Sequence, residues 1–525
     1  MGRAFVPHTI TSDSALGGSV IDHSLRFNRG DNPHLSRTPS SAGNRKVWTY
    51  SVWLKRTDFG ARSFFQAYDG SSSRRFQLSF NGSDQINFNQ GGNSSSGLAN
   101  SYMTFRDPTA WYHIVGVADY SNSTAADRFK VYVNGSQISL NITDGIENAD
   151  GQCNGAFEHE IGAIGSSGNV FDGYMADINF IDGQALDASY FGYTEFQTKV
   201  WRPKRYTGTY GNNGFKLDFR DFTSNSGNNI GYDYSGNQNN FSPDNFGGNT
   251  DGTTDSPTNN FCTFNKIMDY SLNADISEAG LRVQGPTSGH GDKRIFSPFS
   301  IPLTGKYYIE AKFVKNGARG TIGFTDGNPN GGSTGTNNPI NFSFYGGGYS
   351  STATRPNYST LGDFSLNDFL VIALDMDAGR MWIKKNGNID ITAGEQINSI
   401  VRTNLDNTYR WYYQETSGDN SAVEWNFGQR PYNYTQPDGF QTMSTRNIQP
   451  TYFDATNQPA KTFLNPKKHF DVLTWTGNGS NGNAITGLEF QPDFIWGKCR
   501  SNGHDHQLID SIRGTTKYLS SNRTD

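Results

Sequence analysis

The stretch DPTAWYHIVGVADYSNSTAADRFKVYVNGSQISL, residues 107–140, decides the fold. Successive side chains of a strand point to opposite faces of the sheet. One face of the segment 111–118 therefore carries Trp111, His113, Val115 and Val117, and the other carries Tyr112, Ile114, Gly116 and Ala118. Both faces are largely apolar, which predicts an inner strand that is covered on both sides.

A hairpin signal follows this strand. Phe129, Val131 and Val133 alternate with more polar residues, and Asn134-Gly135 then predicts a two-residue type I′ turn, because Asn and Gly both accept the left-handed conformation. The stretch NDFLVIALDMDAGRMWIKKNGNIDI, residues 367–391, repeats the plan with predicted strands at 368–375 and 380–385. We therefore expect two antiparallel sandwiches of similar construction in one chain.

Short strands separated by turn residues fill residues 24–188. Their sequences are SLRFN, WTYSVWLKR, FQLSFN, QINFNQ, WYHIVGVADY, RFKVYVNG, EIGAIG and GYMADINFIDG. Clusters of Gly, Asn, Ser and Asp separate them, a pattern typical of an antiparallel sandwich or barrel. No amphipathic helix is predicted in this region.

Composition supports an all-β chain of several domains. The 525 residues include 60 glycines, 14% aromatic residues and only 18% charged residues, which suits many strands joined by tight turns. The net charge of −5 provides no basic field for a phosphate backbone, so nucleic acid is not expected as a partner. Three scattered cysteines predict neither a disulfide framework nor a zinc site.

Neither membrane insertion nor export is expected. The longest uninterrupted apolar run, FLVIAL at 369–374, is far shorter than the 18 or more residues that a spanning helix needs. The first 25 residues lack the continuous apolar core of a secretory signal. We therefore expect the protein to fold in a cytoplasm.

Two blocks of sequence resemble known domain families. WYHIVGVAD, FKVYVNG and FDGYMADINFIDGQAL resemble the laminin-G-like member of the concanavalin A-like sandwich class, over residues 24–192. GKYYIEAKF, GTIGFTD, DFLVIALDMDAGRMWIKKNG and EWNFGQRPYNYTQPDGFQ are similar to the SPRY domain, over residues 260–445. The expected fold class is all-β, with tandem antiparallel β-sandwiches: a concanavalin A-like jelly roll and then a SPRY-like sandwich.

Three further segments complete the predicted organisation. Residues 1–23 form an N-terminal arm, a candidate for docking to a larger particle. Residues 193–259 are rich in Asn, Gly, Asp and Ser and contain one strand-like island, GFKLDF, so we expect an extended connector that packs on the first sandwich. Residues 446–525 are interpreted as a linker and the truncated start of a further β domain.

The order of these units resembles the long structural proteins of marine tailed bacteriophages, especially cyanophages. The first sandwich is followed by VWRPKRYTGTYGNNGFKLDF, the SPRY-like unit, and then GLEFQPDFIW and DSIRGTTKYLSSN. The resemblance implies a tail fibre or related appendage of the virion, made in the host cytoplasm. It also implies a homotrimer whose partners are other virion proteins and a host-surface glycan. A purely architectural head or tail protein is the alternative.

No catalytic constellation is found, so an enzyme is not expected. His113 lacks a nearby carboxylate or a second metal ligand at a suitable spacing, and is interpreted as a packed strand residue. Glycanases of the concanavalin A-like class resemble one another in an E-x-D-x-x-E strand. Glu158, Glu160 and Asp177 occupy comparable strands without that spacing. A glycan-degrading tailspike is therefore the less favoured alternative.

Candidate binding residues fall in two groups. Trp201, Tyr206 and Tyr210, beside three basic residues, form the densest aromatic cluster and are candidates for stacking on sugar rings. The alternative for them is packing of the connector on the sandwich or on another subunit.

Acidic turns provide the second group. Asp119, Asp127 and Asp233 are candidate calcium ligands, because carboxylates beside backbone carbonyls are the hard oxygen ligands that calcium prefers. Asp and Asn also stabilise such turns without a metal. No other cofactor is expected.

Overall fold

The structure is a computed structural model. It describes residues 19–70, 75–90, 97–143, 147–165, 168–195, 199–270, 273–287, 293–302, 304–315, 320–325, 364–392, 396–397, 410–415, 420–447, 470–480, 482–488, 490–514 and 516–523. The chain divides into two compact units, Met1–Pro450 and Thr451–Asp525. No helix in these described ranges is long and apolar enough to cross a membrane.

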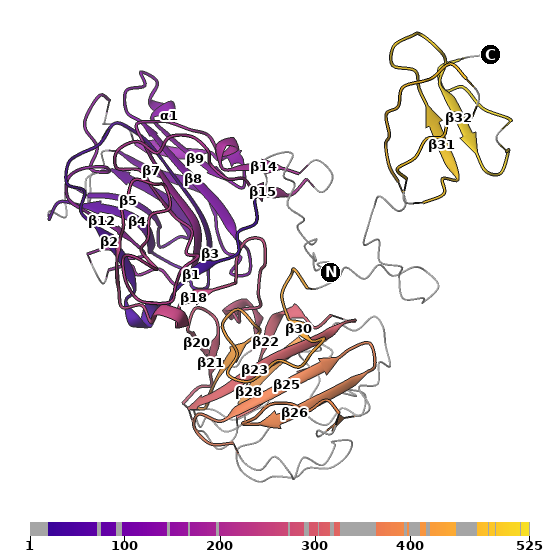
Figure 1. The fold of residues 1–525 in the computed structure, drawn as a ribbon. Helices are drawn as coiled ribbons and strands as arrows, with labels where there is room; N and C mark the ends of the chain where they lie inside the picture. The colour runs from indigo at the N-terminus through magenta and orange to yellow at the C-terminus, as the bar shows by residue number, and fades with distance from the viewer. Residues whose placement is uncertain are drawn as a thin grey trace. The chain divides into compact units, whose positions relative to one another are not determined.

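The first sandwich, drawn in indigo and magenta in Figure 1, consists of two eight-stranded sheets. The first sheet has the order β10(Ser136–Gln137), β9(Phe129–Val133), β8(Tyr112–Asp119), β3(Val47–Arg56), β13(Gly173–Asp182), β1(Ser24–Phe27) and β18(Gly252–Thr253), with β16(Phe215–Leu217) beside β13. The second has the order β11(Leu140–Thr143), β7(Leu98–Thr104), β6(Gln85–Gln90), β5(Arg75–Phe80), β4(Arg62–Tyr68), β12(Glu158–Ile161), β2(His34–Arg37) and β17(Ser242–Asp244). All pairings in both sheets are antiparallel.

Aromatic side chains fill the space between these sheets. Trp48 of β3 stacks on Phe88 of β6 with ring centroids 5.6 Å apart, and Tyr50 stacks on Phe65 at 4.4 Å. These rings belong to one buried apolar cluster to which both sheets contribute. Burial of such rings is the main favourable term in folding, so this cluster holds the two sheets together.

Strand β8 is covered on both faces, which confirms the prediction for this segment. Ile114 and Ala118 lie in the core between the sheets. Val115 and Val117 lie in a second cluster on the outer face of the sheet, together with Ile181, Leu186, Ala188, Phe191 and Tyr206. The short hairpin of β14(Gly192–Thr194) and β15(Trp201–Pro203) borders this outer cluster, with Trp201 packed against it.

The predicted Asn-Gly turn is also confirmed. Asn134 and Gly135 have φ values of 47° and 83°, both in the left-handed region, and Val133 pairs with Ser136 across the turn. The helix α1(Ala125–Arg128) precedes β9. Single turns of 3-10 helix lie at η2(Arg29–Asp31), η3(Ala188–Tyr190), η4(Gly248–Thr250) and η5(Lys266–Met268).

Residues of the predicted connector extend both sheets of the first sandwich. Phe215 of β16 pairs with Phe180, Pro243 of β17 pairs with Leu35, and Gly252 of β18 pairs with Leu25. The island GFKLDF was the only strand predicted here, and it corresponds to β16. The boundaries at 192 and 259 stay predictions.

The second sandwich has one four-stranded and one eight-stranded sheet. The smaller has the order β19(Asp269–Tyr270), β22(Lys293–Ser300), β28(Arg410–Glu415) and β24(Gly320–Thr325). The larger has the order β20(Asp275–Ser277), β21(Arg282–Gln284), β29(Ala422–Asn426), β23(Lys306–Lys315), β25(Phe369–Asp375), β26(Arg380–Lys385) and β27(Gln396–Ile397), with β30(Gln441–Thr442) parallel to β23. Trp411 and Trp425, with centroids 5.9 Å apart, lie in the core between them. The all-β fold class with tandem antiparallel sandwiches is thus confirmed.

The unit Thr451–Asp525 contains the antiparallel pair β31(Phe494–Gly497) and β32(Gln507–Asp510). Trp496 pairs with Leu508, and Ile495 pairs with Ile509. Trp496 is exposed, as are its neighbours Phe494 and Ile495.

Candidate functional site

The three aromatic residues predicted to bind sugar pack against the first sandwich. Trp201 is half-buried, and its Nε1 donates a hydrogen bond to His113 Nδ1 at 3.0 Å. Tyr206 is only 7% exposed and donates to the carbonyl of Thr209, and Tyr210 donates to Asn179 Oδ1 at 2.8 Å. All three rings contact the outer cluster. The structure therefore favours the packing interpretation over the sugar-binding one.

His113 is part of the same packing. Its ring lies between those of Trp53 and Trp201, with centroids 4.7 and 5.9 Å away. Because Trp201 donates to Nδ1, the ring proton is on Nε2, which lies 2.9 Å from Ser51 Oγ. Burial lowers the pKa of His113 to about 3, so the imidazole is neutral at pH 7. This supports the interpretation of His113 as a structural residue.

The candidate calcium ligands do not form one ligand set. Asp233 is buried, and its carboxylate accepts hydrogen bonds from the backbone of Lys216, Ser235 and Asn239, which is the behaviour of a turn residue. Asp127 forms an ion pair with Lys130 at 3.0 Å, and Asp119 accepts a hydrogen bond from Ser121. Within the described ranges, no three His, Cys, Asp or Glu residues lie close enough to hold a metal ion.

The three carboxylates considered for catalysis lie on two different sheets. Glu158 and Glu160 belong to β12, and Asp177 belongs to β13. Glu160 is buried and accepts the backbone N–H of Gly165 at 2.7 Å. The expectation that the chain is not an enzyme stays a prediction.

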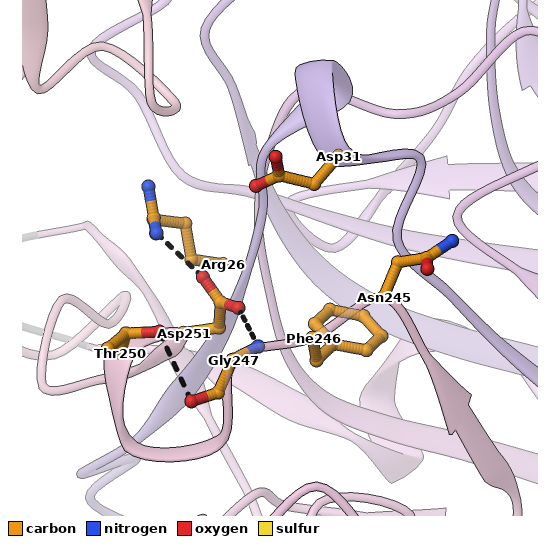
Figure 2. A pocket seen from close by; sticks show the side chains of 7 residues that line it. All are labelled: Arg26, Asp31, Asn245, Phe246, Gly247, Thr250 and Asp251. Carbon is orange, nitrogen blue, oxygen red and sulfur yellow. Dashed lines mark hydrogen bonds and ion pairs between the residues drawn. The ribbon is translucent and has the colours of Figure 1, made fainter.

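Two pockets formed by described residues are further candidate sites, and neither was predicted. The first, which we call the rim pocket, has a volume of about 410 Å³. Figure 2 shows its lining residues, which are Arg26, Asp31, Asn245, Phe246, Gly247, Thr250 and Asp251. Arg26 comes from β1, Asp31 from η2, and the others from the turn between β17 and β18.

Close packing of this turn positions its polar groups. Asp251 Oδ2 accepts the backbone N–H of Gly247 at 2.6 Å, and the Thr250 hydroxyl donates to the Gly247 carbonyl at 3.2 Å (Figure 2). A Cβ atom on Gly247 would lie 2.1 Å from Thr250 Oγ1, so a larger residue would displace the side chain of Thr250. The carboxylate of Asp251 is therefore held by the backbone of its own turn.

Arg26 is enclosed by carboxylates. Its guanidinium is 2.7 Å from Asp251 Oδ1 and 2.5 Å from Glu278 Oε2. Burial alone would lower the pKa of Arg26, but the two carboxylates outweigh it and hold the pKa above its usual value. The buried Nε of Arg26 has no hydrogen-bond partner in the described part of the chain.

Asp31 adds a further negative charge at the mouth of the rim pocket. It is exposed, and one of its oxygens accepts a hydrogen bond from Asn28 at 2.7 Å. Asp31 and the two carboxylates around Arg26 carry three negative charges, whereas the guanidinium carries one positive charge. The rim pocket therefore offers acceptors for hydroxyl donors and repels anions.

A buried carboxyl group supports the turn that carries Asp31. Asp172 accepts the backbone N–H of Arg29, and its Oδ1 has no partner among the residues described. Burial, together with the nearby charge of Asp58, raises the pKa of Asp172 to about 7.

The second pocket, which we call the arm pocket, has a volume of about 380 Å³. Its lining residues are Ser19, Val20, Ile21, Asp22, His23, Asp177, Arg205, Lys216, Asp218 and Arg220. Ile21 is buried against Trp53, Trp111 and Tyr174, and Thr258 bonds its backbone. Residues 19–23 are thus anchored in the first unit, and the docking prediction for the rest of the arm falls on residues 1–18, outside the described residues.

Most charged side chains of the arm pocket form ion pairs. Lys216 Nζ is 3.3 Å from Asp177 and 3.7 Å from Asp218, which also pairs with Arg220. Asp22 pairs with Arg446 at 3.1 Å.

Asp177 adopts a strained backbone conformation at the arm pocket. Its φ is 44°, at the point where the register between β13 and β3 shifts. A left-handed non-glycine residue inside a strand costs about 1 kcal/mol or more, and such residues cluster at functional sites.

Family models match two parts of the chain. The concanavalin A-like lectin/glucanases superfamily matches residues 29–189, which contain most strands of the first sandwich. A domain of unknown function matches residues 465–525. A search of curated proteins found no matching relative.

Solved structures resemble parts of the chain at low identity. A pentraxin from Limulus polyphemus is 18% identical over 33% of this chain and 80% of its own, with a TM-score of 0.26. The SPRY domain of human HERC1 is 17% identical over 32% and 99%, with a TM-score of 0.24. Tailspike protein 2 of an Escherichia coli O157:H7 bacteriophage is 15% identical over 34% and 25%, with a TM-score of 0.25. At these values the likenesses support no conclusion about function.

Proposed function

We propose that this chain is a structural protein of a tailed phage, a tail fibre or related appendage, whose first sandwich binds saccharides of the host surface. The virion part rests on the resemblance of the domain order to such proteins. The glycan-binding part rests on the rim pocket, which lies in a sandwich of the concanavalin A-like lectin/glucanases class.

The rim pocket has the chemistry and size that saccharide binding needs. Its volume of about 410 Å³ lies within the usual range for small-ligand sites, about 300 to 1,000 Å³. In the proposed complex, sugar hydroxyls donate to the carboxylate of Asp31, which is exposed at the mouth of the pocket. The excess of acceptors suits a neutral sugar.

Attachment by such a protein depends on avidity. A single open pocket binds a neutral sugar weakly, but several subunits that present the same pocket together convert weak contacts into strong attachment. The expected homotrimer and the docking role of residues 1–18 belong to this proposal.

Binding of the purified full chain to an array of neutral host-type glycans tests the glycan-binding part. We expect Asp31→Asn to weaken binding about tenfold, because a charged acceptor is replaced by a weaker neutral one. Asp438→Asn, an exposed carboxylate of the second sandwich, is the matched control and should leave binding unchanged. The rim pocket would be rejected as a glycan site if both variants lost the same amount of glycan affinity, or if neither the wild type nor the variants bound any glycan.

Immunogold electron microscopy of purified virus tests the virion part. With antibody against the second sandwich, we expect gold on tail appendages. Gold on the head would favour the architectural alternative, and intact particles without gold would contradict the virion assignment. An assay for reducing ends released from host polysaccharide separates the glycan-degrading alternative from both.

A further inference from the structure

The arm pocket differs from the rim pocket in the charge that it leaves unpaired. Its cations Lys216 and Arg220 share the carboxylates of Asp177 and Asp218, while Asp22 pairs with Arg446. Arg205 is exposed at the pocket and forms no ion pair with any carboxylate in the described residues. The lining carries three cations and three carboxylates, but Asp22 is paired with Arg446 outside the lining, so the guanidinium of Arg205 is left without a carboxylate partner in the described residues.

We propose that the arm pocket is a second saccharide site and that its ligand is a sugar acid, a saccharide unit with one carboxylate and several free hydroxyls. This inference rests on the proposed glycan-binding function and adds a site and a ligand class to it. A guanidinium binds a carboxylate through two parallel hydrogen bonds, so Arg205 takes the carboxylate of the sugar.

The neighbouring carboxylates select a polyhydroxylated monoanion over other anions. Asp22, Asp177 and Asp218 line the same pocket and would repel a phosphate that carries nearly two negative charges. Their oxygens accept hydrogen bonds from hydroxyl groups, which a sugar provides and a simple carboxylate does not. Burial lowers the pKa of His23, so this ring adds no positive charge at pH 7.

The geometry of the pocket also fits a single sugar unit. Its volume of about 380 Å³ is similar to that of the rim pocket. Lys216 is held between two carboxylates, and Arg220 lies over the ring of Tyr234 at 4.2 Å, so these walls are ordered before a ligand arrives. Only the side chain of Arg205 needs to be ordered on binding.

Ligand-observed NMR titration of the full chain tests the inference with glucuronate, glucose and inorganic phosphate as probes. We expect glucuronate to bind about tenfold more tightly than glucose, and phosphate to bind more weakly than glucuronate. Arg205→Gln should reduce the affinity for glucuronate about tenfold. Lys384→Gln removes an exposed positive charge from the second sandwich and should change nothing. Asp31→Asn should weaken glucose binding and leave glucuronate binding intact.

The outcomes separate this inference from the proposed function. If glucose and glucuronate bind equally, if phosphate binds more tightly than glucuronate, or if Arg205→Gln and Lys384→Gln behave alike, the inference is wrong. Glucose binding that still depends on Asp31 would then leave the proposed function standing. If no saccharide binds, both fail.

Discussion

The rim pocket and the arm pocket both lie on the first sandwich and both combine arginine with aspartate side chains, yet their unpaired charges are opposite. In the rim pocket, two carboxylates enclose Arg26 and Asp31 adds a further negative charge. In the arm pocket, the carboxylates are shared among cations and Arg205 remains without a partner in the described residues. We therefore expect ligand preference to depend on which charges are already paired, more than on which residue types are present.

The pockets also differ in how deeply their charges are buried. The side chain of Arg26 is 5% exposed, and that of its partner Asp251 is 8% exposed. Arg205 is exposed to solvent. A buried charge depends on its partners, whereas an exposed charge is solvated by water. Arg26 should therefore be coupled to the stability of the fold, and Arg205 should not.

The largest expected effect is on stability. Arg26→Ala should lower the free energy of unfolding by about 3 to 5 kcal/mol, because two carboxylates lose their buried partner. Arg205→Ala should change it by less than about 0.5 kcal/mol. Urea unfolding of both variants measures the free energy of unfolding. Equal stability of the two variants would show that the fold does not depend on Arg26 as the buried partner of the two carboxylates.

The second effect is a pH dependence of stability that comes from Asp172, beneath the turn that carries Asp31. Because the folded-state pKa of Asp172 is raised to about 7, the native state binds more protons than the unfolded state between about pH 4 and 7. Asp172 therefore lowers stability as pH rises through this window, by at most about 4 kcal/mol. Asp172→Asn should stabilise the protein at pH 8 and have much less effect at pH 4.

Thermal unfolding of wild type and Asp172→Asn across this pH range checks the sign. A stabilisation that does not vary with pH would mean that Asp172 is not protonated in the native state. Because Asp172 bonds the backbone of the turn that carries Asp31, neutral-sugar binding should show the same pH dependence. Binding of glucuronate should not weaken as pH falls, because protonation of His23 at low pH adds a positive charge to the arm pocket.

The smallest expected effect is that of salt. Raising the ionic strength from about 50 mM to about 500 mM should weaken glucuronate binding roughly threefold, because the charge of Arg205 is exposed and screened. Glucose binding at the rim pocket should stay constant. If salt weakened glucose and glucuronate binding by the same factor, the proposed difference in charge between the two pockets would be contradicted.

Locally determined parts of the fold could be predicted from the sequence. Strand β8, the Asn134-Gly135 turn and strand β26 follow from alternation and turn chemistry within a few residues. Strand β17 was missed because its sequence, Ser-Pro-Asp, resembles a turn and becomes a strand only by pairing with β2. Pairing across 200 residues is a tertiary effect that local pattern does not contain.

The candidate site was harder to predict for the same reason. Aromatic side chains suit packing as well as sugar binding, and Trp201 and Tyr206 proved to be packed. The rim pocket joins Arg26 and Asp31 to Asp251, and no local spacing connects them. The arm pocket could be recognised in the sequence from one pattern. Lys216, Asp218 and Arg220 alternate along a single strand-like segment, so their side chains share one face.

The central claim is that the two pockets bind saccharides of opposite charge preference. The most direct test is to titrate wild type, Asp31→Asn and Arg205→Gln with glucose and with glucuronate under one set of conditions. We predict that Asp31→Asn loses glucose alone and that Arg205→Gln loses glucuronate alone. If each variant loses both sugars equally, or neither variant loses any, the account of two charge-selective pockets is contradicted.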